Sequence, residues 1–124
     1  EKGEPQNVSN IAWACATLGI HSPKLFGEID KHAAWLVEEG NTQAIANTAR
    51  AVSMLQFGTP KLMAEINRRS QWFIDNGTTQ EIANVAMAFA SVGYKATRFF
   101  TLLEKSVEKL VAQGNAQEAI NCCY

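Results

Sequence analysis

Apolar residues recur along the chain at the three- and four-residue spacing of a helix that is buried on one side. The first run predicts a helix over roughly residues 5–18 and assigns to the core the side chains of Val8, Ile11, Ala12, Cys15 and Leu18. The next run predicts a second helix that begins at Pro23, ends at Gly40 and buries Leu25, Phe26, Ile29, Ala33, Leu36 and Val37. No segment alternates apolar and polar residues as a strand does, so the pattern indicates an all-α protein.

This two-helix pattern returns every 37 residues without an insertion. Identical residues mark the period in three sets: Gln6, Gln43, Gln80 and Gln117; Asn10, Asn47, Asn84 and Asn121; Gly3, Gly40, Gly77 and Gly114. The period gives units 3–39, 40–76 and 77–113 and a partial unit 114–124, which form a single array over residues 1–124. Because a two-helix unit cannot bury its apolar face alone, the units are expected to stack into a right-handed α-solenoid.

Capping residues mark the expected helix starts. Asn41, Thr78 and Asn115 precede the first helices, and Ser22 and Thr59, each followed by Pro, precede the second helices. Thr78 with Glu81 has the spacing of a capping box. Unit three has Ala96-Thr97 in place of the cap–Pro pair, which moves the expected cap to Thr97.

One stripe along each first helix is predicted to be exposed and to contact a ligand. Its positions are spaced by four, three and four residues, so they lie on one side of a helix. The stripe consists of Gln6, Asn10, Trp13 and Thr17 in unit one, Gln43, Asn47, Arg50 and Met54 in unit two, Gln80, Asn84, Met87 and Ser91 in unit three, and Asn121 and Tyr124, with Gln117, in the partial unit.

Two positions of the stripe repeat in every unit and one varies. The repeated Gln and Asn cannot distinguish successive ligand groups. Either their amides bond within the array, to a helix start or to a neighbouring unit's backbone, or they contact a repetitive ligand such as a peptide or phosphate backbone. The varying position holds Trp13, Arg50, Met87 and Tyr124. Aromatic and Arg planes stack on nucleobases, whereas packing of Trp13 and Met87 against an adjacent unit is the alternative.

Composition and charge narrow the function. The 124 residues are 47% apolar with a net charge of −1, which excludes disorder and gives no basic patch for an anionic partner. No run approaches the 18–20 apolar residues of a membrane span. Three cysteines, two of them adjacent, indicate a reducing compartment rather than a disulfide framework. The two histidines lack the spacing of a metal site or a catalytic triad, and no Gly-rich phosphate loop is present, so we expect no cofactor, no metal and no enzymatic activity.

The strings QNVSNIAWACATLG, residues 6–19, and SPKLF, residues 22–26, resemble the octotricopeptide and heptatricopeptide repeat proteins of algae and alveolates. These are helical-repeat proteins of organelles, related in plan to the pentatricopeptide repeats and often carrying a C-terminal RAP domain. The resemblance implies binding of single-stranded RNA in a plastid or mitochondrion, with action on the stability, processing or translation of transcripts.

A second hypothesis is a scaffold subunit of a large organellar complex, such as a ribosome, photosystem or respiratory complex, that acts through protein–protein contacts. Under both hypotheses we expect an organellar protein, soluble or peripherally attached, without membrane insertion. The chain begins Glu1-Lys2-Gly3 and has no polar capping helix, which suggests an excerpt whose ends are covered by further repeats or by a partner.

Overall fold

The computed structural model describes the backbone of residues 4–112 and side chains as far as residue 107. Its described part contains helices joined by short loops and no strand, which confirms the all-α prediction. The eight helices of this part are α1 (Pro5–Leu18), α2 (Pro23–Lys31), α3 (Ala33–Glu39), α4 (Thr42–Met54), α5 (Pro60–Arg68), α6 (Ser70–Asn76), α7 (Thr79–Val92) and α8 (Thr97–Ala112).

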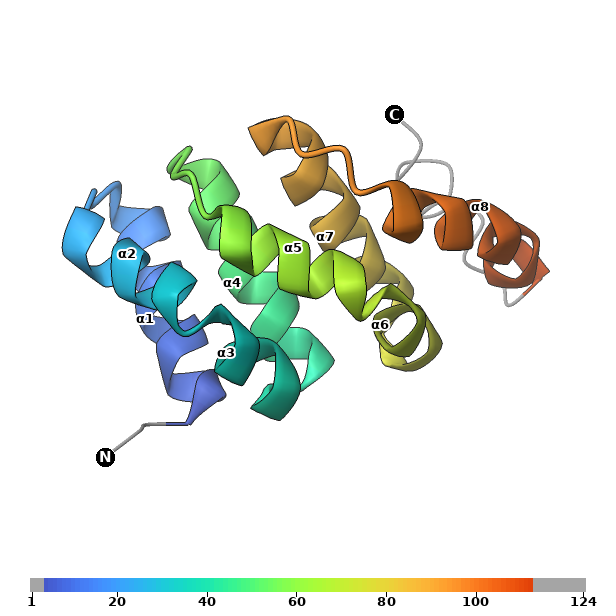
Figure 1. Ribbon diagram of the computed structural model, residues 1–124, viewed down its shortest axis with the longest axis horizontal. Coiled ribbons are helices and arrows are strands. Elements are labelled where there is room, and N and C mark those ends of the chain that lie inside the picture. The colour runs from blue at the N-terminus through green and yellow to red at the C-terminus, as the bar shows by residue number, and fades with distance from the viewer. Residues whose placement is uncertain (1–3, 113–124) are drawn as a thin grey trace.

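The helices lie in two layers (Figure 1). The first helices form one layer, in which α1 packs against α4 and α4 against α7. The second helices form the other, in which α5 contacts α2 and α3, and α8 contacts α5 and α6. Neighbours within each layer are therefore one period apart in sequence.

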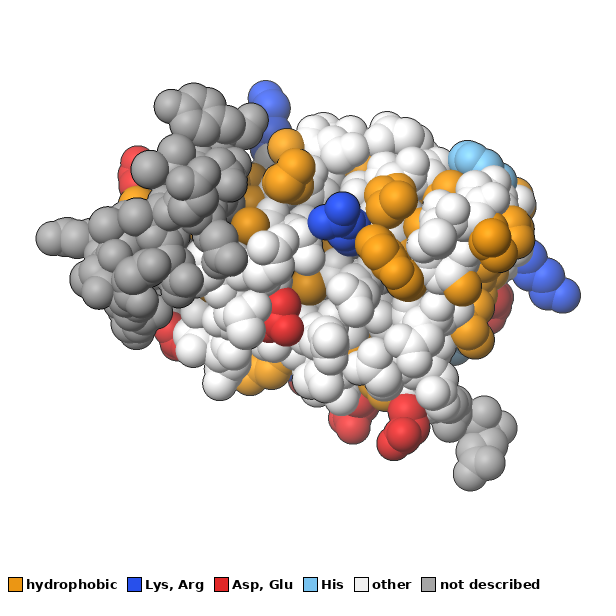
Figure 2. All heavy atoms as spheres, turned by 180° about the vertical axis from the view of Figure 1, so that it is seen from behind, with side chains coloured by type: hydrophobic (Ala, Val, Ile, Leu, Met, Phe, Trp, Pro, Cys, Tyr) orange, Lys and Arg blue, Asp and Glu red, His pale blue; other side chains and the backbone are white. Residues whose placement is uncertain are grey.

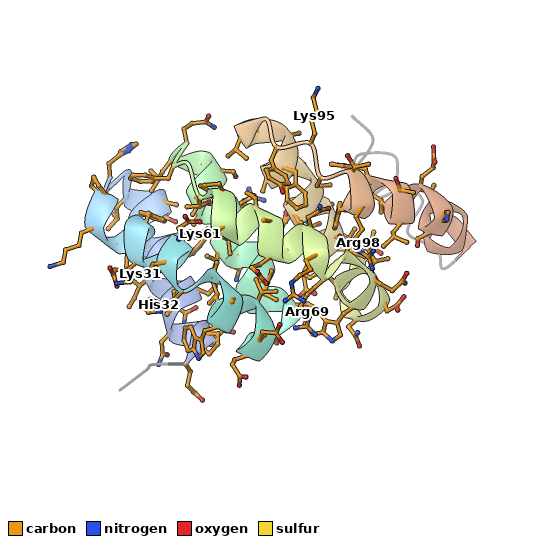
Figure 3. All side chains as sticks on the ribbon, viewed as in Figure 1. Lys31, His32, Lys61, Arg69, Lys95 and Arg98 are labelled. Atoms are coloured by element: carbon orange, nitrogen blue, oxygen red, sulfur yellow. The ribbon has the colours of Figure 1, made fainter. Side chains whose placement is uncertain are left out.

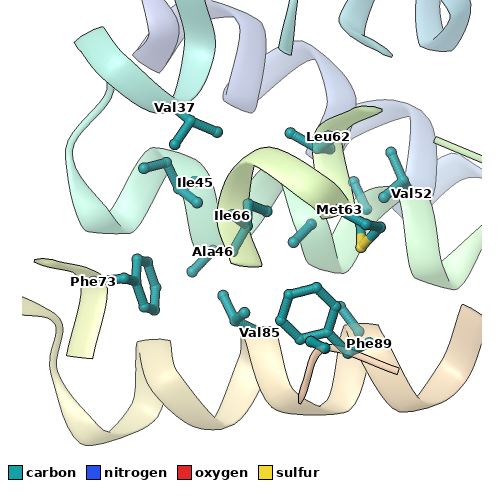
Figure 4. Close-up of a cluster of buried hydrophobic side chains, with 14 of the residues drawn as sticks. Val37, Ile45, Ala46, Val52, Leu62, Met63, Ile66, Phe73, Val85 and Phe89 are labelled. Carbon is teal, nitrogen blue, oxygen red and sulfur yellow. The ribbon is translucent and has the colours of Figure 1, made fainter. Parts of the chain in front are cut away.

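The core lies between the two layers and runs from unit to unit. Figure 4 shows part of it, where side chains of α4 and α5 meet those of α7. The largest fully buried side chains include Phe26, Phe73, Phe89, Phe99, Leu36, Ile45, Leu62, Met63, Ile66 and Ile82. Small residues fill the space where the first helices meet, since Ala12, Ala49 and Ala51 have no exposed surface.

Two apolar residues assigned to the core are on the surface. Ile11 is 53% exposed and Leu18 is 71% exposed, so that prediction is wrong for these two. Their equivalents Thr48 and Leu55 are buried, because α1 packs on that side of α4. The helical spacing of apolar residues does not tell which side of a helix a neighbouring unit covers.

The prediction of one second helix per unit is wrong in units one and two. The helix is interrupted at His32 and at Arg69, where ψ is 25° and 27°. Buried residues precede and follow each break, so the helical spacing of apolar residues continues through the break. At the second break, the side chain of Arg69 donates a hydrogen bond of 3.0 Å to the carbonyl of Val37 in α3. Helix α8 is continuous.

Several predicted caps are confirmed. Ser22 accepts a hydrogen bond from the Leu25 amide, Asn41 caps α4, and Thr78 forms a capping box with Glu81. Thr97 is the first residue of α8 rather than a residue preceding it. Asn115 lies outside the described residues.

The predicted cap at Thr59 is wrong, and a neighbouring unit supplies the bond instead. The Thr59 hydroxyl is buried without a partner in the described part of the chain. The Leu62 amide in the first turn of α5 donates to Oδ1 of Asp30, at 2.9 Å. One period later, the Phe99 amide donates to Oδ1 of Asn67, at 3.0 Å. Each second helix thus caps the start of the next, which explains why unit three tolerates Ala96 where unit one has a capping serine.

Gly40 follows the second helix as predicted, and its backbone is extended, with φ −81° and ψ 153°. A Cβ atom there would lie 2.5 Å from the carbonyl oxygen of Leu36. Gly77 is equivalent, with the Phe73 carbonyl oxygen 2.8 Å from such an atom. Close approach of the backbone is therefore the reason for glycine at both positions.

Candidate functional site

The stripe lies on the outer surface of the first-helix layer. In units one to three its side chains are exposed or half-buried, including Trp13 at 38% and Met87 at 60% exposure. Figure 2 views the molecule from behind Figure 1 and shows apolar side chains gathered around a basic one on this face. Gln117, Asn121 and Tyr124 lie outside the described residues.

Trp13 and Arg50 occupy the same stripe position in successive units and contact each other. The guanidinium carbon of Arg50 lies 5.5 Å from the centroid of the Trp13 ring. A cation this close to an indole face is held by the ring's quadrupole. The hydroxyl of Thr17 donates to the carbonyl of Trp13, at 2.9 Å. Arg50 also donates to Oδ1 of Asn84, at 3.1 Å, so it links all three units on this face.

The repeated Gln and Asn bond to each other rather than to backbone. Gln6 donates to Oδ1 of Asn10 at 3.1 Å, and Gln80 to Oδ1 of Asn84 at 3.2 Å. In unit two, neither side chain of this pair has a hydrogen-bond partner among the described residues. Neither the bond to a neighbouring backbone nor the one to a helix start is present for the described members of these sets. These amides remain partly exposed and keep unused donors.

A hollow of about 180 Å³ opens between α4 and α7 in the stripe. It is lined by Arg50, Ser53, Met54, Asn84, Met87, Ala88 and Ser91. Five of these seven are stripe residues, and Ser53 and Ala88 are next to stripe residues in sequence, so the hollow lies within the predicted stripe.

Charged residues are sparse on this layer. Helices α1, α4 and α7 contain one cation, Arg50, and one anion, Glu81. Figure 3 shows that labelled basic side chains such as Lys31, Lys61 and Arg98 belong to the second-helix layer, where they are spread over separate helices. The described face therefore has no cluster of cations for a phosphate backbone.

A charged cluster joins units one and two on the second layer. Arg68 lies 2.7 Å from Glu38 and 2.8 Å from Glu65, and Arg69 lies 4.5 Å from the ring centroid of Trp72. The hydrogen bond from Arg68, followed by the charge of Arg69, lowers the pKa of Glu38. A lowered pKa contributes stability above the ordinary pKa that is lost as the pH falls through the folded value. The carboxylate is exposed, so solvent screens this contribution.

The sequence pattern did not mark Gln56 as part of this face. Gln56 has a positive φ of 57°, and its equivalents Gly19 and Gly93 have φ of 70° and 73°. Its amide donates to the Ser53 carbonyl at 2.7 Å and to the Ser91 hydroxyl oxygen at 2.9 Å. The only sign of its role in the sequence was the replacement of the glycine that the other two units have at this position. The structure explains the replacement, because the Gln56 side chain links α4 to α7.

We expect Gln56→Gly to be more stable than Gln56→Ala by about 1 kcal/mol, because both remove the amide and only glycine adopts a positive φ without steric cost. Urea unfolding followed by circular dichroism measures the difference. Gly58→Ala is the control, since φ at Gly58 is not positive and nothing lies within 4 Å of an added Cβ. Equal stability of the two Gln56 variants would contradict the strain.

Metal sites and membrane spans are absent from the described part of the chain. No group of three His, Cys, Asp or Glu side chains there could hold a metal ion. Cys15 is half-buried against the core. Among the described helices, none has the length and apolarity needed to cross a bilayer. No protein-family model matches the chain, and no curated protein or solved structure matches it either.

Proposed function

We propose that the two layers form a segment of a right-handed α-solenoid built from 37-residue units. Support comes from helix contacts that recur one period apart. Helix α1 packs against α4, and α4 in turn packs against α7. The caps from Asp30 and Asn67 recur in the same way. Ile11 and Leu18 are exposed where their equivalents in unit two are buried. A further unit stacked on α1 would cover them.

We propose that the stripe is a non-catalytic binding face for single-stranded RNA in organellar gene expression. The observation that carries this proposal is the exposed Trp13–Arg50 pair beside partly exposed amides that keep free donors. Indole and guanidinium planes stack on any nucleobase, and Asn and Gln hydrogen-bond to base edges. The resemblance of residues 6–19 to organellar repeat proteins points to the same ligand.

The sparse charge determines how such binding would depend on salt. Each neutralised phosphate contributes a slope of about −0.7 to the plot of log K against log salt for a single strand. With Arg50 as the only cation on the described face, we expect a slope near −1 and micromolar affinity. Stacking rather than phosphate contact would supply most of the binding free energy.

The test is fluorescence anisotropy of a labelled 12-nucleotide RNA with wild type and the double variant Trp13→Ala/Arg50→Ala. We expect the double variant to bind at least about fivefold more weakly, since one stacked base contributes about 1–3 kcal/mol. Arg98→Ala, which removes an exposed cation on the other layer, should bind as wild type does. No binding up to 100 µM RNA at low salt, on the order of 50 mM, would contradict the proposal.

A scaffold role is the second candidate, favoured by the exposed apolar edge of α1. Ile11 and Leu18 lie there at 53% and 71% exposure, and Ile20, in the loop after α1, is 48% exposed. Ile11 and Leu18 are seven residues apart, so they lie on one side of α1, and contiguous exposed apolar surface is typical of protein contacts. In gently lysed organelles, a scaffold would sediment with a large complex after RNase treatment, and Leu18→Glu would release it. Sedimentation that disappears with RNase would favour the RNA proposal instead.

A further inference from the structure

The hollow between α4 and α7 is lined by both apolar and polar side chains. It is lined by two methionines, Met54 from α4 and Met87 from α7, and by the polar side chains of Arg50, Asn84 and Ser91. Both methionines are exposed, at 49% and 60%. A ligand entering the hollow therefore meets polarizable apolar groups from both helices and polar groups between them.

Internal hydrogen bonds occupy the amide acceptor of the hollow and one lone pair of its exposed hydroxyl. Oδ1 of Asn84 accepts from both Arg50 and Gln80. Since Arg has no acceptor atom, these contacts fix the orientation of the Asn84 amide and leave its NH₂ group unused. The Ser91 oxygen accepts from Gln56, and its hydroxyl hydrogen has no acceptor in the described part of the chain.

The charged and amide groups that remain for a ligand are donors, and only the hydroxyl oxygens of Ser53 and Ser91 keep acceptor lone pairs among the polar lining side chains. Arg50 contributes its guanidinium N–H groups, Asn84 its NH₂ and Ser91 its O–H. The Ser53 hydroxyl is buried and donates to the Arg50 carbonyl, at 2.8 Å. A ligand that fits must therefore present acceptors side by side and a flat apolar surface to Met54 and Met87.

Among nucleobases, guanine presents two adjacent acceptors, O6 and N7, on one edge, and it is the usual target of Arg. Adenine has a donor at N6 beside N7, and cytosine has a donor at N4. We propose that the hollow between α4 and α7 takes the O6/N7 edge of a guanine in single-stranded RNA, an inference that rests on the proposed function. Arg50 would then hold one base in the hollow while Trp13 stacks on a neighbouring one.

Base analogues test the inference without changing the protein. Four 12-nucleotide oligouridines carry one central guanosine, inosine, 7-deazaguanosine or adenosine, and anisotropy gives the dissociation constant of each. Inosine keeps O6 and N7, so it should bind within twofold of guanosine. Loss of N7 in 7-deazaguanosine, or the N6 donor of adenosine, should weaken binding about tenfold.

Two variants locate the effect. Arg50→Met removes the principal donors, and Asn84→Asp replaces the free NH₂ with an acceptor, so both should bind all four oligonucleotides equally. Asn7→Asp is the matched control, because it makes the same substitution at an exposed position of α1 that lies outside both the stripe and the lining of the hollow. It should keep the preference for guanosine.

The outcomes separate the two proposals. Equal affinity of the wild type for all four oligonucleotides, or a preference for guanosine that survives both variants, overturns the guanine site and leaves the RNA proposal standing. No binding of any oligonucleotide overturns both. Displacement of bound RNA by a polyglutamate peptide in the wild type and not in Arg50→Met would assign the hollow to a protein carboxylate and overturn the guanine site.

Discussion

Replacement of Phe89 by Ala is expected to lower the free energy of unfolding by about 3–5 kcal/mol, the range for deleting a buried aromatic ring. The Phe89 side chain has no exposed surface. Its ring centroid lies 5.2 Å from that of Phe99, 5.6 Å from that of Tyr94 and 6.1 Å from that of Phe100. Removal of the ring would create a cavity. The neighbouring rings could fill it only by giving up their contacts with one another. Urea unfolding followed by circular dichroism measures the effect.

Met87→Ala is the control for this experiment. Met87 is on the same helix and is 60% exposed, so its truncation should change the free energy of unfolding by no more than about 0.5 kcal/mol. A loss below 1 kcal/mol in Phe89→Ala would contradict the packing of α7 against α8.

Ala51→Leu is expected to cost about 1–3 kcal/mol through overpacking. Ala51 is fully buried, and α4 contacts both α1 and α7. The larger side chain would push α4 away from its neighbour. Exposure of the equivalent Ala14 on the outer side of α1 indicates that Ala51 faces α1. Thermal and urea unfolding both report the change.

Ala14→Leu provides a matched control, since it makes the same substitution one period earlier at an exposed position. Its effect should stay within about 0.5 kcal/mol. A cost as large as that of Ala51→Leu would mean that the outer edge of α1 is covered in solution, and the stacking described for the first helices would need revision.

The repeat and the exposed stripe could be predicted from the sequence because both depend on local spacing. Met87, for example, lies on the side of its helix opposite the buried residues, and helical spacing alone places it there. Ile11 shows the limit of that reasoning, because its exposure depends on which side the next unit occupies.

The cap from Asp30 to Leu62 could not be predicted either, because it joins residues 32 apart through a side chain that a helical pattern treats as solvent-facing. The hollow between α4 and α7 depends in the same way on contacts between units. The sequence shows one sign of the positive φ at Gln56, because the other two units have glycine at this position. The reason for the replacement is visible only in the structure, in the hydrogen bond from Gln56 to Ser91.

The caps from Asp30 and Asn67 have a consequence for how such a protein can grow during evolution. A duplicated unit brings a second helix whose start is capped by the unit before it, and it carries the acceptor that the unit after it needs. Duplication therefore lengthens the array without a new capping residue having to arise by mutation. Since Asp and Asn both serve as the acceptor, each copy can also gain or lose a negative charge while its neighbour stays capped.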